Sequence, residues 1–484
     1  MSELPQGWTT APLGVIGSWG SGGTPSRGNS SYFEGHIPWA VIGDLKDGTL
    51  TSTQQTISKN GLDNSAAKLV PANALLVAMY GSIGKLAITG IECATNQAIA
   101  FCVPDTETIA LRYLFYSILQ SRNALNELGQ GAGQQNISQT ILKEFKIPLA
   151  PLAEQKRIAQ KLDALLAQVD TLKARIDAIP ALLKRFRQSV LSAALNGQLT
   201  IDFVERSCNS ETLMTQLKED HAAAGGHARG NASQPVEEAH DLTQEKIPGH
   251  WRVGELRDLC EPGRPITYGI LKPGPELEVG IPYIRVADFP GNKLNPATIK
   301  NTSEEIDFAY RRARLKAGDL LLSIRGSVGR LIKIPAELEG ANITQDTARL
   351  SISGRVSVDF VHLALRAEDT QRRMRAATRG VAVRGINIGD VRALQIPVPG
   401  MDEQAEIVRR VEQLFAYANQ LEAKVAAAQQ RIDALTQSLL AKAFRGELVP
   451  QDPSDEPASV LLDRIRARRA ATPKPKRGRK AATS

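Results

Sequence analysis

The sequence has little of the residue types that build metal, redox and disulfide sites. Its 484 residues include four cysteines and six histidines, and both are dispersed along the chain. No two cysteines form a Cys-x-x-Cys pair, so we expect neither a zinc site nor a disulfide framework. The first residues lack the basic and apolar regions of a secretory leader. Together these absences favour a cytoplasmic protein without a bound metal.

Long hydrophobic runs and catalytic signatures are also missing. No apolar run approaches membrane-spanning length. Residues 295–297 do not supply the Asn/Asp-Pro-Pro-aromatic loop of an amino-methyltransferase, and the Gly84-Lys85 pair lacks the rest of a phosphate-binding P-loop. The glycine-rich residues 129–133 do not join a strand to a helix, so we interpret them as a turn. The sequence therefore predicts a protein with no catalytic residues of its own.

Positive charge is present but unevenly placed. Residues 1–150 hold 9 basic and 10 acidic side chains, a net charge of −1, whereas residues 245–399 hold 24 and 18, a net charge of +6. Residues 464–484 contain nine Lys or Arg and no acid. Such basic segments are typical of proteins that bind a polyanion. The near-neutral first segment weakens that argument for the chain as a whole.

Two long stretches, residues 152–196 and 401–445, share one apolar pattern. Apolar residues recur in alternating steps of four and three, and adding 249 to a position in the first stretch gives its counterpart in the second. This 3.5-residue period predicts two long helices that pair by supercoiling. The predicted seam includes Ile158, Leu162, Leu165, Val169, Leu172, Ile407, Val411, Leu414, Leu421 and Val425. Pro180 lies inside the first stretch and predicts a kink without a break.

The seam has two possible partners. It could join two copies of the chain, but two seams of equal length in one chain favour pairing within the molecule.

The segments before the two helices also repeat. Residues 247–251 (Ile-Pro-Gly-His-Trp) correspond to residues 4–8 (Leu-Pro-Gln-Gly-Trp), and residues 326–330 correspond to residues 81–85. Short apolar runs bounded by Gly, Pro, Asn and Asp, such as residues 75–80, are typical of buried strands. The chain is therefore predicted to be an α+β protein, a tandem duplication of a β-rich domain followed by a long helix.

The predicted boundaries follow from this duplication. They are residues 1–150 for the first domain, 151–200 for the first long helix, 201–246 for a short helix and linker, 247–399 for the second domain, 400–448 for the second long helix, and 449–484 for a short helix and a basic, disordered tail.

Two loops in each domain carry side chains suited to nucleic acid. One follows a predicted buried strand and is rich in glycine, and the other holds Gln, Asn or Arg, which match the base edges of adenine and guanine. The candidate DNA-binding residues are Lys85, Gln134, Gln135, Asn136, Arg325, Arg330, Arg384 and Asn387. Plain β-turns and solvated polar loops are the alternatives for the same residues.

The repeated segments resemble the specificity subunits of type I restriction–modification systems, and are most similar to subfamily IA. The resemblance covers the full chain. Its most specific parts are residues 151–155 with 184–188, and Glu403 and Gln404 with residues 441–448. The two β-rich segments, by contrast, differ strongly from each other, as expected of domains that recognise different sequences.

The resemblance implies a non-catalytic DNA-recognition subunit with two target recognition domains. The two long helices would form an antiparallel coiled coil with pseudo-twofold symmetry, which the residues alone leave undecided. The implied partners are double-stranded DNA, two modification (methyltransferase) subunits and two ATP-dependent restriction subunits. S-adenosylmethionine, ATP and Mg²⁺ would be bound by those partners, and no cofactor by this chain. A self-sufficient modification enzyme and a coiled-coil scaffold without a nucleic-acid role are the alternatives.

Overall fold

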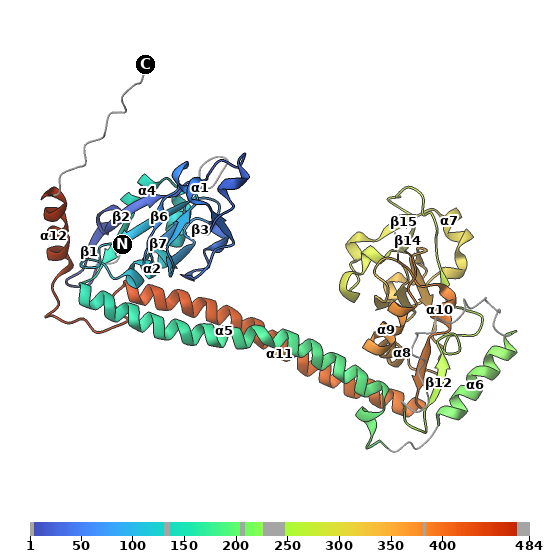
Figure 1. Cartoon of the computed structure of the whole chain (residues 1–484). Coiled ribbons are helices and arrows are strands. Elements are labelled where there is room, and N and C mark those ends of the chain that lie inside the picture. The colour runs from blue at the N-terminus through green and yellow to red at the C-terminus, as the bar shows by residue number, and fades with distance from the viewer. Residues whose placement is uncertain (1–3, 130–135, 204–208, 226–246, 381–383, 472–484) are drawn as a thin grey trace. The chain divides into compact units, whose positions relative to one another are not determined.

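The computed structural model describes residues 4–129, 136–203, 209–225, 247–380 and 384–471 (Figure 1). These residues form two compact units, one of residues 1–177 with 426–484 and the other of residues 178–425. Each unit therefore combines a β-rich domain with half of one long helix and half of the other. The predicted linker from residue 226 and the basic tail from residue 472 lie outside the described residues.

The first domain is closed by its own first and last strands. β1 (Thr9–Pro12) pairs antiparallel with β11 (Lys146–Leu149). A five-stranded sheet follows the order β2 (Gly17–Ser21), β10 (Ile99–Pro104), β7 (Leu75–Ala78), β8 (Leu86–Thr89) and β4 (Gly48–Leu50). A four-stranded sheet follows the order β5 (Gln55–Ile57), β3 (Ile37–Ala40), β9 (Cys93–Thr95) and β6 (Leu69–Val70). The apolar run at residues 75–80, predicted as a buried strand, contains β7, whose four residues are all buried.

Helices cover the sheets of the first domain. They are α1 (Lys59–Asp63), α2 (Leu111–Gln120), α3 (Arg122–Leu128) and α4 (Gln139–Glu144). Ser121 separates α2 from α3. The apolar face of α2, with Tyr113, Leu114 and Ile118, packs into the domain core.

The second domain repeats this construction. β12 (Arg252–Glu255) pairs with β20 (Gln395–Val398) to close the domain. One sheet has the order β13 (Thr267–Tyr268), β19 (Thr347–Leu350), β16 (Leu320–Ser323) and β17 (Leu331–Lys333), and another has β15 (Lys300–Thr302), β14 (Ile281–Ile284) and β18 (Asn342–Ile343). The helices are α7 (Glu304–Ala309), α8 (Val358–Arg366), α9 (Glu368–Ala376) and α10 (Ile388–Arg392).

The two long helices form as the periodicity predicts. α5 spans Leu152–Leu195 and α11 spans Met401–Phe444. In the first unit Lys173 pairs with Asp433 at 3.0 Å, and Gln429 donates to Asp177 at 2.7 Å. In the second unit Arg187 pairs with Glu422 at 2.8 Å. In the first unit the partner number falls as the number along α5 rises, so the two helices run antiparallel there. α5 continues through Pro180; the kink there stays a prediction.

The apolar stripe of the long helices has two roles. Ile158 and Leu162 belong to the core of the first domain, and Ile407 and Val411 to the core of the second. Farther from the helix starts, Val169 and Val425 are buried, and Leu165, Leu414 and Leu421 are half-buried. Leu172 departs from the expected seam, because its side chain is 49% exposed. The stripe thus anchors each helix start in a domain before it serves helix pairing.

A buried Glu-Gln pair fixes each long helix to its domain. Trp8 Nε1 donates to Glu154 Oε2 at 3.0 Å, and the Gln155 side chain accepts from the backbone N–H of Ala110 at 2.9 Å. The second copy is equivalent. Trp251 Nε1 donates to Glu403 Oε2 at 2.8 Å, and Gln404 accepts from the backbone N–H of Ser357 at 2.9 Å. Because these hydrogen bonds are buried and join the helix start to its domain, they define the angle at which domain and helix meet.

A short helix completes each domain. α6 (Ser210–Ala223) packs Leu213, Met214 and Leu217 against the second domain, and α12 (Ala458–Ala471) packs Leu462 and Ile465 against the first. The N-cap residue of α6 is Asn209. Asn209 accepts from the backbone N–H of Thr212 at 2.8 Å.

Candidate nucleic-acid interface

The glycine-rich loops are tight turns that join two buried strands. In the first domain β7 and β8 are connected by residues 79–85, with Gly81 at φ 64° and Gly84 at φ 78°. In the second domain Gly326 has φ 71° and Gly329 has φ 93°. Side chains larger than hydrogen are strained at such angles, so glycine is required for the turn itself. The glycines therefore fit the plain β-turn interpretation. The role of the side chains that flank them depends on where those side chains lie.

The second predicted loop meets the first in both domains. The backbone N–H of Ile137 donates to Met79 O at 2.9 Å, and Tyr80 forms a bridge with Asn136. In the second domain the backbone N–H of Ile386 donates to Ile324 O at 2.9 Å. Arg325 forms a bridge with Gly385. Two loops that are far apart in sequence thus make one surface at the same place in each domain; we call these surfaces the loop pairs.

The candidate residues of the first loop pair are only partly described. Lys85 and Asn136 are exposed, whereas Gln134 and Gln135 lie outside the described residues. Tyr80 is not among the predicted residues, yet it is 40% exposed and forms a bridge with Asn136. An aromatic residue directly before the first glycine of the turn was the signal that could have identified it, because exposed aromatic side chains stack on bases.

The second loop pair is richer in arginine. Arg325, Arg384 and Asn387 are exposed. Arg325 Nη1 donates to Gln345 Oε1 at 3.1 Å, which adds Gln345 to the surface. Arg330 is half-buried and its guanidinium contacts Val286 O at 3.4 Å, so it supports the turn more than it faces outward. The structure therefore brings three of the four candidates together at an exposed surface.

A side chain from a neighbouring helix holds each turn in place. Arg122 Nε donates to Gly84 O at 2.9 Å, and its guanidinium also pairs with Asp47. In the second domain Gln371 Nε2 donates to Gly329 O at 3.0 Å. The same carbonyl is thus held by a cation in one domain and by an amide in the other. These supports lie on α3 and α9, and nothing in the sequence pattern connects them to the turns.

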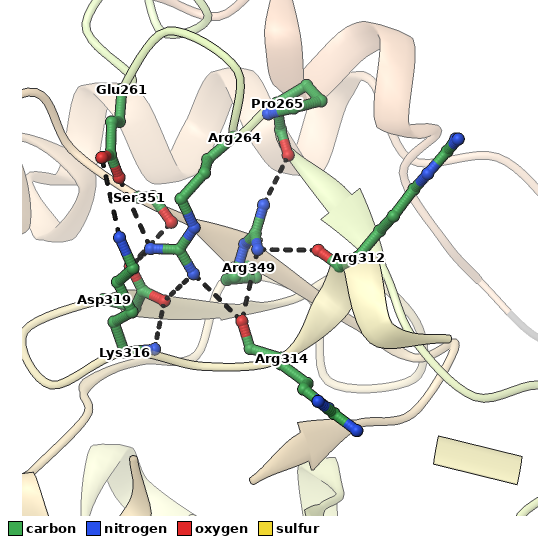
Figure 2. Close-up of polar contacts among 9 residues, drawn as sticks. All are labelled: Glu261, Arg264, Pro265, Arg312, Arg314, Lys316, Asp319, Arg349 and Ser351. Carbon is green, nitrogen blue, oxygen red and sulfur yellow. Dashed lines mark hydrogen bonds and ion pairs between the residues drawn. The ribbon is translucent and has the colours of Figure 1, made fainter. Parts of the chain in front are cut away.

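Part of the positive charge of the second domain serves its own structure (Figure 2). Arg349 on β19 is 3% exposed and donates to the carbonyl oxygens of Pro265 at 3.0 Å and Arg312 at 2.7 Å. Arg264 pairs with the buried Asp319 at 3.1 Å. Burial, followed by repulsion from Arg264, lowers the pKa of Arg349. The net charge of +6 on residues 245–399 is therefore not all evidence for a polyanionic partner, because some of these arginines stabilise the domain itself.

The same network displays other cations at the surface. Figure 2 shows the side chains of Arg312 and Arg314 directed away from Arg349, which holds their backbone. Arg314 pairs with the buried Asp307. Arg312 is exposed, which makes it available to an anion.

The described residues contain no group of three or more His, Cys, Asp or Glu side chains placed to hold a metal ion. Within the same part of the chain, no helix is long and apolar enough to cross a membrane.

The geometry agrees with comparisons to known proteins. The model of the type I restriction modification DNA specificity domain matches residues 5–181 and 248–428. The chain belongs to this family. It is 35% identical to the EcoBI specificity subunit of Escherichia coli over 415 residues, which cover 84% of this chain and 82% of that protein. It is 29% identical to the EcoKI specificity subunit of Escherichia coli strain K12 over 99% of both chains.

Two solved structures from type I R-M work share the fold. The HsdS subunit from Thermoanaerobacter tengcongensis has a TM-score of 0.53 at 18% identity, over 92% of this chain and 98% of that one. A structure concerned with the assembly and conformational transition of the type I R-M system has a TM-score of 0.60 at 18% identity, over 92% of this chain and 100% of that one. The tandem α+β fold with two long paired helices is therefore that of a type I specificity subunit.

Proposed function

We propose that each domain of this specificity subunit recognises one half of a bipartite DNA sequence through its loop pair, and that the long helices set the spacer between the halves. The observation that carries this proposal is that two loops, distant in sequence, meet at the same place in both domains. In both domains the strand-connecting turn and a distant polar loop form one exposed surface. A turn with fixed glycines gives such a surface a rigid base, which favours discrimination between base pairs.

The two loop pairs carry different chemistry, as two different half-sites require. The first presents Tyr80, Lys85 and Asn136, and the second presents Arg325, Arg384 and Asn387. Arginine donates two parallel hydrogen bonds to guanine, and asparagine pairs with adenine. Each such contact discriminates against a wrong base by about 1–3 kcal/mol.

Catalysis is assigned to partner subunits under this proposal. Two modification subunits would bind S-adenosylmethionine, and two restriction subunits would bind ATP and Mg²⁺. The long helices offer the modification subunits an apolar surface. Leu172 and Leu435, which flank the ion pair between Lys173 and Asp433 in the first unit, are 49% and 45% exposed.

Methylation mapping of loop-pair variants tests the proposal. In the full complex, Arg384→Ala is expected to lower the discrimination between base pairs in one half-sequence by about 10-fold or more. Recognition of the other half-sequence should stay unchanged. Asn136→Ala is expected to affect the opposite half only. Arg355→Ala is the matched control, because Arg355 is exposed and pairs with Asp220 of α6, away from the loop pairs.

Three outcomes would count against the proposal. Unchanged methylation in both loop-pair variants would show that these loops do not contact bases. Methyl transfer by the purified chain with S-adenosylmethionine and DNA would indicate a self-sufficient enzyme. The absence of DNA binding by the assembled complex would indicate a scaffold.

A further inference from the structure

The second domain contains a cationic pocket that lies outside its loop pair. The pocket is a cavity of about 280 Å³ between the end of α8, strand β17 and the loop at residues 291–294. It is smaller than the pockets that usually hold drug-sized ligands. Its lining includes Asn292, Lys293, Leu331, Lys333, His362 and Arg366.

Arg366 is the central cation of the pocket. Its side chain is half-buried, and burial together with repulsion from Arg187 lowers the pKa of its guanidinium. Among the described residues, no carboxylate forms a hydrogen bond or an ion pair with Arg366. A half-buried guanidinium without an anion retains most of the cost of its desolvation, which a bound oxyanion would offset.

Positive charge exceeds negative charge around the cavity. Lys333 pairs with Asp359 at 2.8 Å, and Arg187 pairs with Glu422 at 2.8 Å. Lys293, which lines the pocket, also attracts the Glu422 carboxylate electrostatically. The charged side chains are the cations Arg187, Lys293, Lys333 and Arg366 and the carboxylates Asp359 and Glu422, so four positive charges face two negative ones, a net of +2.

His362 adds an unsatisfied polar atom to the same wall. Its Nε2 is buried and has no hydrogen-bond partner among the described residues, while the ring bonds to the backbone of Leu331. Burial first, and then the nearby Arg366, lower the pKa of His362 to about 4. His362 is therefore a neutral ring in the pocket wall, and the positive charge of the pocket comes from Arg366, Lys293 and Lys333.

The duplication provides an internal comparison. α2 and α8 start at equivalent places, since Ala110 donates to Gln155 as Ser357 donates to Gln404. Counting from these positions, the first domain has Phe115 where the second has His362, and Leu119 where it has Arg366. Strand pairing places Ile88 opposite Leu75 as Lys333 lies opposite Leu320.

The first domain therefore fills this region with apolar side chains. Phe115 is 2% exposed and Ile88 is 5% exposed, and both belong to the domain core. Three apolar positions in one copy are cations or histidine in the other. Because apolar packing at these positions is compatible with the fold, structure alone does not require the polar set.

We propose that this pocket of the second domain is a phosphate-binding site. The guanidinium of Arg366 and the ammonium groups of Lys293 and Lys333 line one cavity, and their positive charge suits a tetrahedral oxyanion. The phosphate could be a free ion or a phosphodiester of bound DNA. The second source rests on the proposed function, whereas the first does not.

Calorimetric titration of the full chain with inorganic phosphate tests the site, with sodium chloride at matched ionic strength as reference. The wild-type protein is expected to bind one phosphate saturably. Arg366→Leu, which introduces the residue of the first domain, is expected to weaken that binding at least 10-fold. Arg375→Leu is the control, because Arg375 is exposed and pairs with Glu368 on α9. Thermal unfolding of each variant verifies that it is folded.

A DNA arm distinguishes the two sources of phosphate. Affinity of the assembled complex for duplex DNA is measured over a range of salt concentrations. If the pocket holds a phosphodiester, Arg366→Leu reduces the slope of log K against log salt by about 0.9 and leaves the methylated sequence unchanged. If it holds free phosphate, only the calorimetric signal is lost. If wild type and Arg366→Leu have the same phosphate affinity and the same salt dependence of DNA binding, the phosphate site is overturned. Sequence-specific DNA binding by the complex would still support the proposed function in that case.

Discussion

At the level of single residues, the two helix anchors differ in how well the buried glutamate is satisfied. Glu403 accepts hydrogen bonds from Trp251, Thr200 and His250, which together reach both of its oxygens. In the first copy Trp8 bonds to Glu154 Oε2, but Oε1 is buried without a partner. Burial therefore raises the pKa of Glu154, and the Trp8 hydrogen bond offsets this only in part.

The raised pKa of Glu154 predicts a pH dependence for the first unit. The folded state holds the proton to higher pH than the unfolded state, so this residue contributes stability below the unfolded pKa of about 4.3. That contribution is lost as pH rises through the folded pKa. Glu154→Gln keeps an acceptor for Trp8 without the charge. Chemical denaturation from pH 4 to pH 8 should show a flatter decline in the variant than in wild type.

Variants of the tryptophan partners provide the comparison for this residue. Trp8→Phe leaves Glu154 without its donor and should destabilise the first unit by about 1–3 kcal/mol at pH 7. Trp251→Phe should be milder, because Glu403 retains Thr200 and His250. Parallel pH profiles for wild type and Glu154→Gln would exclude Glu154 as the source of the dependence.

At the level of elements, the long helices were predictable from the sequence, but their surroundings were not. The 3.5-residue period indicates which side of a helix is apolar. It does not indicate whether a domain or another helix covers that side, so Ile158 and Ile407 were assigned to helix pairing although both lie in domain cores. The prediction that Leu172 is buried in the seam between the helices was wrong for a related reason. Its neighbour Lys173 pairs with Asp433 of the partner helix, and the side chain of Leu172 stays 49% exposed.

The loop pairs show the same limit. Gly81 and Gly326 were recognisable as turn residues because of their place between apolar runs. The contact of Tyr80 with Asn136 depends on sheet topology, which brings together residues separated by more than fifty positions. The support of the turns by Arg122 and Gln371 uses different residue types in the two copies, so no shared motif marks it.

The short helix α12 is predicted to be part of the first folded unit. Leu461, Leu462 and Ile465 are at most 4% exposed, and the backbone N–H of Ala458 donates to Gly7 O at 2.9 Å. Truncation after Pro457 removes three buried side chains worth about 5 kcal/mol or more together, which is comparable to the stability of a whole domain. Calorimetry should show an early transition for the first unit and an unchanged one for the second.

A second truncation controls for the loss of chain length. Ending the chain after Ala471 removes residues 472–484 and retains α12, so the first transition should stay where it is in the full chain. A protein that ends at Pro457 and melts like wild type would show that α12 does not stabilise the domain.

At the level of the whole molecule, the two copies of the duplication share their structural contacts but differ in net charge. The Glu-Gln anchors, the loop pairs and the closing short helices recur in both units. Net charge does not recur, since residues 1–150 carry −1 and residues 245–399 carry +6. Under the proposed function, phosphate contacts near the first domain come mainly from a modification subunit. Specific DNA affinity should therefore be low for the isolated chain and rise when that subunit is added.

The length of the long helices is predicted to set the spacer between the two half-sequences. Seven residues inserted after Ala174 in α5, and seven after Arg431 in α11, lie opposite each other because Lys173 faces Asp433. The insertion preserves the apolar register and lengthens each helix by about 10 Å. At about 3.4 Å per base pair, the preferred spacer should grow by three base pairs. Methylome sequencing of cells carrying the variant measures both the spacer and the half-sequences.

Three added base pairs also turn the DNA by roughly a third of a helical turn, so the variant should methylate its new sites less completely than the parent. A two-residue insertion at the same places is the matched control. It rotates the apolar stripe by about 200°, to the opposite side of the helix, and methylation should be lost because the helices no longer pair. New half-sequences with the old spacer would contradict the assignment of spacing to the helices, because the half-sequences depend on the loop pairs and these are unchanged in the variant.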